Sequence, residues 1–312
     1  MKPRTLLGGL AASTLSVAAA NRALAARAGA LPPALPGDHH TYRWRGFEVE
    51  YAEGGDPSDP DLILLHGVHA AATSQEFDRV FDRLCEDHHV LVPDLPGFGR
   101  SSRPPVTYTS ALYEEFVADF AVAHAVEATC VATSLTGAYA ARVADRAGFS
   151  RLVLVCPTGD AGPRRPWLRA LFRAPVLGEG LFNLLVSRPS LRYFDRVEGY
   201  ADGADETTLD YQWRTAHREG ARYAPASFVG GYLTPGYDLE SVLAEASVPV
   251  TLVWGREATR PPLEAGRALA ERADARLVVV GRSRLLPHAE RPGAFLEAIE
   301  SDLAIGVGAE DE

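Results

Sequence analysis

The stretch "VATSLTGAYAA", residues 131–141, decides the fold that this sequence predicts. An apolar strand ends on Ser134, and a helical pattern begins at the next residue. So abrupt a turn needs small neighbours, which Ala132, Thr136 and Gly137 supply. The helix N-terminus behind the serine presents backbone N–H groups, starting with Leu135, that can stabilise negative charge. The pattern predicts a nucleophilic serine or, as the alternative, an ordinary serine N-cap.

Apolar strands alternate with helices on both sides of this turn. Strands without polar alternation are expected near residues 62–67, 89–94, 128–134, 151–157 and 248–255. Helical patterns follow several of them, as in residues 75–84 and 112–122. Strands of this kind form parallel sheets that are covered on both faces. We therefore predict an α/β fold with a mostly parallel, doubly wound sheet.

The alternation of strands and helices is interrupted between residues 158 and 239, where the sequence is helix-like and rich in aromatic residues. Such an insertion predicts a helical cap over the carboxyl edge of the sheet, the edge where open α/β sheets bind ligands. The predicted organisation has four parts. They are an N-terminal helical segment (1–30), a Pro-rich linker (31–40), an α/β core (41–157 and 240–305) and the cap (158–239).

The composition is that of a globular protein and disfavours nucleic acid as a partner. The 312 residues are 46% hydrophobic and carry a net charge of −10, whereas phosphate binding needs clustered basic charge. Three cysteines without metal-ligand spacing indicate neither a disulfide framework nor a zinc site. No metal, nucleotide or flavin motif is visible, so we expect no cofactor.

Residues 1–30 combine basic charge with an apolar run. Lys2 and Arg4 precede apolar residues 6–20, as in a signal peptide, but Arg22 and Arg27 follow on a continuing helical pattern. Two interpretations stay open, a cleaved export signal and a helix that makes peripheral membrane contact. The expected location is accordingly cytoplasmic or membrane-associated, with export as the alternative.

Two further motifs accompany the strand-to-helix turn. They are "LLHGVHAA", residues 64–71, and "DLPGFGRS", residues 94–101. Together the three resemble the α/β-hydrolase family from about residue 41 to residue 303. The resemblance implies an α/β-hydrolase fold with an inserted cap, Ser134 as nucleophile, and the N–H groups of Val68 and Leu135 as oxyanion donors. The serine motif departs from G-x-S-x-G, because Ala132 and Thr136 replace the two glycines.

The positions of the family's acid and base do not match. The acid usually falls in a "WGxxD" pattern, and here "WGREA" places Ala258 at that position, with Glu257 just before it. Aligning "LPHAERP" with the family's histidine motif places Leu285 where the base belongs. His69 and His288 are candidates for a replacement base, and Glu257 for a replacement acid.

Two functions are compatible with a matching serine motif and oxyanion loop beside acid and base positions that do not match. The first is a serine hydrolase with a degenerate triad, acting on an ester or other acyl bond of a small apolar substrate. The second is a non-catalytic ligand-binding protein with a hydrolase fold, because a serine without an adjacent base is a poor nucleophile. Leu285 and cap aromatics would line an apolar pocket, with core packing as the alternative for each aromatic. These aromatics are Trp167, Phe182, Tyr193, Phe194 and Trp213.

Overall fold

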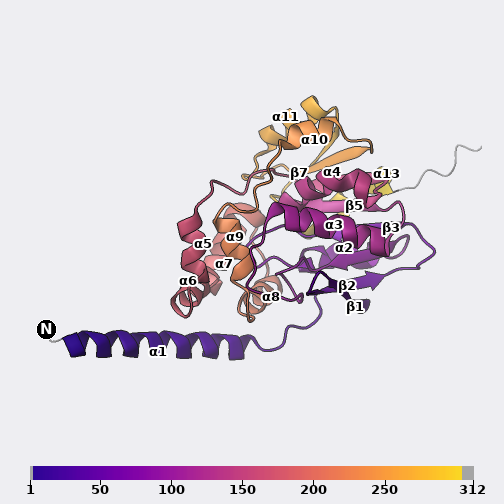
Figure 1. Ribbon diagram of the computed structural model, residues 1–312. Helices are drawn as coiled ribbons and strands as arrows, with labels where there is room; N and C mark the ends of the chain where they lie inside the picture. The colour runs from indigo at the N-terminus through magenta and orange to yellow at the C-terminus, as the bar shows by residue number, and fades with distance from the viewer. Residues whose placement is uncertain (1–2, 304–312) are drawn as a thin grey trace, which may run out of the picture.

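The computed structural model describes residues 3–303, with side chains from residue 14 onward, and contains an eight-stranded sheet (Figure 1). The strand order is β1-β2-β4-β3-β5-β6-β7-β8, and all pairs among β3–β8 are parallel. The predicted fold class is confirmed. The strands are β1 (Asp38–Trp44), β2 (Phe47–Gly54), β3 (Asp61–Leu65), β4 (His89–Pro93), β5 (Thr129–Thr133), β6 (Arg151–Val155), β7 (Val250–Gly255) and β8 (Arg276–Val280).

Helices cover both faces of the sheet, because consecutive strand residues point to opposite sides. Ile63 and Leu65 pack in one core with α3 and α4, whereas Leu62 and Leu64 pack in the other with α2 and α13. The helices of the two layers are α2 (Asp78–Leu84), α3 (Ser110–His124), α4 (Leu135–Ala147), α10 (Leu239–Ala244), α11 (Leu263–Ala273), α12 (Pro287–Glu290) and α13 (Pro292–Leu303).

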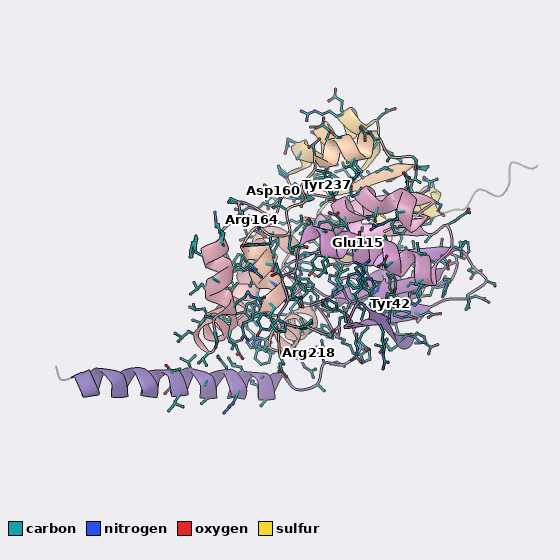
Figure 2. The ribbon with its side chains drawn as sticks, viewed as in Figure 1. Tyr42, Glu115, Asp160, Arg164, Arg218 and Tyr237 are labelled. Carbon is teal, nitrogen blue, oxygen red and sulfur yellow. The ribbon has the colours of Figure 1, made fainter. Side chains whose placement is uncertain are left out.

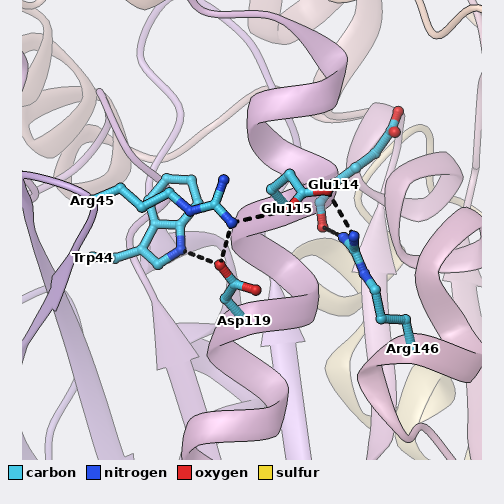
Figure 3. Close-up of polar contacts among 6 residues, drawn as sticks. All are labelled: Trp44, Arg45, Glu114, Glu115, Asp119 and Arg146. Carbon is cyan, nitrogen blue, oxygen red and sulfur yellow. Dashed lines mark hydrogen bonds and ion pairs between the residues drawn. The ribbon is translucent and has the colours of Figure 1, made fainter.

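A polar network ties the β1–β2 hairpin to α3 and α4 (Figure 3). Arg45 occupies the left-handed region at the hairpin turn, with φ 46°, followed by Gly46 with φ 86°. The Trp44 indole donates to Asp119 at 2.7 Å, and Arg45 donates to Asp119 and to Glu115 at 3.0 Å. Since Glu115 also accepts from Arg146 of α4, the hairpin helps to hold the helix that begins beside Ser134.

A helical insertion separates β6 from β7. It contains α5 (Pro166–Arg173), α6 (Leu177–Leu185), α7 (Arg188–Phe194), η2 (Asp195–Gly199), α8 (Glu206–Ala216) and α9 (Tyr223–Val229).

The insertion contacts loops that follow three parallel strands. Arg218, labelled in Figure 2, donates to the Gly99 carbonyl after β4 at 2.8 Å. Thr259, after β7, donates to the Val197 carbonyl, and the Ala201 N–H donates to Glu290, after β8. These contacts place the insertion at the carboxyl edge of the sheet, the edge at which β5 ends and Ser134 follows.

The N-terminal helix α1 (Pro3–Ala28) lies beside α6 and α8 (Figure 1). Its last turns are hydrogen-bonded to the insertion. The Asn21 amide donates to the Val176 carbonyl at 3.0 Å, and Arg214 donates to the Ala28 and Ala30 carbonyls. Among the described residues, no helix is both long and apolar enough to cross a membrane.

The linker is shorter than predicted. The sequence pattern places it at residues 31–40, but Asp38, His39 and His40 already pair with β2. Leu31 and Leu35 are buried, so residues 31–37 pack against the rest of the protein.

Candidate functional site

Ser134 stands on a strained turn between β5 and α4. Its backbone has φ 57° and ψ −127°, a combination that costs free energy in a residue with a side chain. The Ser134 N–H donates to the Val155 carbonyl at 2.9 Å, which fixes the turn against β6. A Cβ added at Gly137 would lie 3.1 Å from Pro157, so a small residue is needed there. The surrounding packing holds a half-buried serine in a conformation typical of nucleophiles.

The loop after β3 lies against this serine. A Cβ built on Gly67 would stand 3.5 Å from the Ser134 Cβ. The Thr136 hydroxyl donates to the His66 carbonyl at 2.8 Å, joining the loop to the first turn of α4. The His66 ring bonds to the Gly67 carbonyl and accepts from the Leu95 N–H at 3.0 Å, so both its nitrogens serve the backbone. His66 is therefore structural.

Two buried backbone donors flank the serine. Val68 is 5% exposed and Leu135 is 1% exposed, and neither N–H donates a hydrogen bond to any group within residues 3–303. Buried N–H groups are nearly always paired, so unpaired ones call for an explanation. Their positions beside Ser134 are those of the predicted oxyanion donors, which would pair with a developing oxyanion.

The expected acid and base positions belong to one apolar cluster. Ala258 is buried with Trp254 and Leu263, and Leu285 packs against the same group. No hydrogen bond of the Ser134 hydroxyl is found in the described part of the chain. Both positions therefore lie in apolar packing.

His69 is partly buried on the loop after β3, and its ring is already engaged. Its Nδ1 accepts from the Ala71 N–H at 3.3 Å, which places the ring proton on Nε2. Burial lowers the pKa of His69 to about 4, against the opposing effect of the Glu76 charge. A neutral ring with its acceptor nitrogen occupied is not a ready base for Ser134.

His288 is fully buried and lies beside a carboxylate. Its Nε2 is 3.4 Å from Glu76 Oε1, and its ring stacks on Phe77 with centroids 4.8 Å apart. Both Glu76 oxygens accept from the Gly67 N–H at 3.3 Å. Burial acts to raise the pKa of Glu76, but His288 and other neighbours outweigh it and hold that pKa below its usual value. The pair supports the loop beside Ser134 from the side of α12.

Glu257, the candidate replacement acid, joins two loops. Its carboxylate accepts from the Ser283 N–H at 2.9 Å, and its own N–H donates to the Ser283 carbonyl at 3.0 Å. This reciprocal pair ties the turn after β7 to the turn after β8. Among the described residues, no histidine is bonded to this carboxylate.

The five aromatics expected on a pocket wall fall into two groups. Phe182 and Trp213 are buried in a core between α1, α6 and α8, a core that also contains Ala71 of the loop after β3. Trp167, Tyr193 and Phe194 are 67%, 62% and 43% exposed on the outside of the insertion.

Glu76 and Tyr200 are site residues that the sequence reasoning missed. Tyr200 comes from the insertion and is buried against Leu285, Leu286 and Ala289. Glu76 occupies the buried stripe of its helical segment, four residues before Val80. An acidic residue on an apolar stripe was the available signal. The sequence around Tyr200 carries no such signal, because this residue follows η2 in a segment without helical or strand periodicity.

Comparison with known proteins agrees with this architecture. A sequence model described as "Alpha/beta hydrolase family" matches residues 62–298. The uncharacterized hydrolase YugF of Bacillus subtilis is 27% identical over 274 residues, covering 81% of this chain and 93% of YugF. An uncharacterized protein of Mycobacterium tuberculosis is 26% identical over 280 residues, covering 84% of this chain and 78% of that protein.

A solved structure shares the fold at lower identity. A serine hydrolase involved in carbazole degradation superposes with a TM-score of 0.69 at 19% identity, covering 86% of this chain and 99% of that one. The similarity to it concerns the fold alone.

Proposed function

The chain belongs to the alpha/beta hydrolase family, and from this premise we propose that it is a serine hydrolase of ester or other acyl bonds in small apolar molecules, with a degenerate triad. The observation that carries the proposal is the pair of unpaired, buried N–H groups on Val68 and Leu135. A purely structural serine turn has no need of two orphaned donors.

In the proposed reaction the Ser134 oxygen attacks the carbonyl carbon of the substrate. Negative charge moves to the carbonyl oxygen, where the Val68 and Leu135 N–H groups stabilise it. The alcohol leaves with a proton, and water then hydrolyses the acyl-serine. Because no histidine takes the serine proton, water must accept it, and the rate falls to roughly 10³–10⁴-fold above the uncatalysed reaction.

The insertion supports an apolar substrate. We propose that it acts as a cap in which Tyr200, packed with Leu285, presents an apolar surface to the substrate. A ligand held there would be shielded from water, which strengthens the effect of the two N–H donors.

One observation favours a second function, that of a non-catalytic ligand-binding protein. Ala258 and Leu285, which the sequence motifs align with the family's acid and base, share one apolar cluster. An apolar cluster at this place suits binding and does nothing for proton transfer.

A fluorophosphonate probe distinguishes the two functions. We expect slow labelling of the unmodified protein that Ser134→Ala abolishes. The double variant Ala258→Asp with Leu285→His should label at least about 10²-fold faster, because an oriented imidazole activates the serine.

The matched control is Ala258→Asp with Leu285→Asn, which adds polarity without a base and should not accelerate labelling. Labelling of the unmodified protein no faster than that of Ser134→Ala would reject hydrolysis and leave the binding function.

A further inference from the structure

Exposed apolar side chains gather on the outer side of the insertion. On α6, Leu177, Leu181 and Leu184 are 56%, 40% and 70% exposed. Their spacing of four and three residues places them on one side of the helix. On α5, Trp167 and Leu171 share a side in the same way, and that helix buries no residue. We call these five residues the outer face.

The two helices of the outer face, α5 and α6, are neighbours, and α1 lies on the other flank of α6. The α5–α6 turn is tight, since a Cβ on Gly178 would lie 2.5 Å from the Leu171 carbonyl oxygen. On the other flank of α6, Asn183 donates to Asn21 of α1 at 3.0 Å. The exposed leucines of α6 therefore lie between α5 and α1.

Basic charge is concentrated in the same segments. Residues 164–196 contain seven Arg against two acidic residues, and residues 1–30 contain four basic residues and no acidic one. These two segments carry a net charge of +9, so the rest of the chain carries −19.

Most of the arginines of these segments whose side chains the structure describes have no acidic partner. Within the described part of the chain, Arg188 and Arg192 pair with acids, whereas Arg22, Arg164 and Arg165 have no acidic partner. Arg164, beside α5 in Figure 2, lies instead over the Tyr232 ring.

We propose that the outer face docks on an anionic lipid bilayer surface. Leucines and a tryptophan would enter the interfacial region while the arginines contact the lipid headgroups. A second copy of the chain fits less well, because a symmetric contact through this face would bring two positively charged surfaces together. The proposal concerns attachment and does not depend on hydrolysis by Ser134.

The chain contains its own fluorescent reporter for this contact. Of the four tryptophans, Trp44, Trp213 and Trp254 are buried, and only Trp167 is exposed. We expect vesicles that contain phosphatidylglycerol to shift the emission of the full chain to shorter wavelength. Trp167→Phe should lose the shift but still sediment with the vesicles.

Variants of matched charge test the face itself. Leu181→Glu with Leu184→Glu should weaken sedimentation with anionic vesicles at least about tenfold. Val122→Glu with Val126→Glu is the control, because both valines are exposed, at 66% and 79%, in and just after α3, away from the outer face. The control pair should change binding by less than about twofold.

Three results would overturn the proposal. One is equal binding to phosphatidylcholine and phosphatidylglycerol vesicles with no effect of salt. Another is an equal loss of binding in both double variants. The third is a lipid-free dimer, seen by sedimentation velocity, that Leu181→Glu with Leu184→Glu dissociates.

Discussion

His69, on the loop beside Ser134, is expected to make the stability of the protein depend on pH. Burial lowers its pKa to about 4, from an ordinary value of 6.5. Between these pH values the unfolded chain binds a proton at this ring and the native chain does not. The free energy of unfolding therefore falls as the pH decreases through this window, by up to about 3 kcal/mol. The decrease is smaller to the extent that solvent reaches the ring, because water screens the effect of burial.

His69→Asn removes this titration and keeps an acceptor for the Ala71 N–H. We expect the variant to lose less stability than the unmodified protein between pH 6.5 and pH 4. Urea unfolding at several pH values measures the difference. Parallel losses in both proteins would show that the native His69 takes up its proton as readily as the unfolded chain does.

At the scale of single residues, the sequence predicted where a residue lies along the fold better than it predicted which side chains that residue contacts. Ser134 was identifiable because small residues and a change of period surround it. The engagement of His288 with Glu76 was not, because the two lie 212 positions apart and only the folded chain brings them together.

Three elements meet at the Glu76 carboxylate. Glu76 lies in η1 (Ser74–Phe77), Gly67 in the loop after β3, and His288 in α12. The carboxylate is thus the contact through which α12 supports the loop that carries Val68. Removing the acceptor of a buried N–H costs free energy, because water does not replace the lost hydrogen bond.

We expect Glu76→Ala to lower the free energy of unfolding by about 1–3 kcal/mol, because the buried Gly67 N–H loses its acceptor. Glu76→Gln keeps one oxygen acceptor and should cost less than half of that. Urea unfolding of both variants provides the test. Equal losses would contradict this expectation, because they would mean that the oxygen acceptor and the side-chain volume that Gln keeps contribute nothing and that the lost charge accounts for the whole effect.

The elements themselves were largely predictable, since continuous apolar runs and helical periodicity report burial directly. The boundary at Asp38 was not, because the register of β1 on β2 depends on a partner strand rather than on local pattern. The separation of Phe182 from Trp167 also escaped the sequence. Both are aromatic residues in helical segments, and only packing against α1 decides which one is buried.

At the scale of the whole molecule, α1 completes a core shared by the insertion and the loop beside Ser134. Ala28 of α1, Trp213 of the insertion and Ala71 of that loop belong to one buried cluster. Arg214 holds the end of α1 through the carbonyls of Ala28 and Ala30.

Arg214→Met should release this attachment without disturbing the sheet. We expect thermolysin to cleave near Leu31 and Leu35 several-fold faster in the variant, because local opening becomes easier while global unfolding stays rare. Mass spectrometry of the fragments locates the cut. Arg165→Met, at an exposed arginine without an acidic partner, is the control and should leave the rate unchanged.

The apolar cluster that contains Ala258 and Leu285 also constrains how this sequence can change. An aspartate alone at position 258, or a histidine alone at position 285, would place one unpaired polar group in an apolar cluster. Each single step is then unfavourable, although the two together could form a pair. A polar pair at these two positions therefore requires both substitutions together, because either one alone places an uncompensated polar group among apolar side chains.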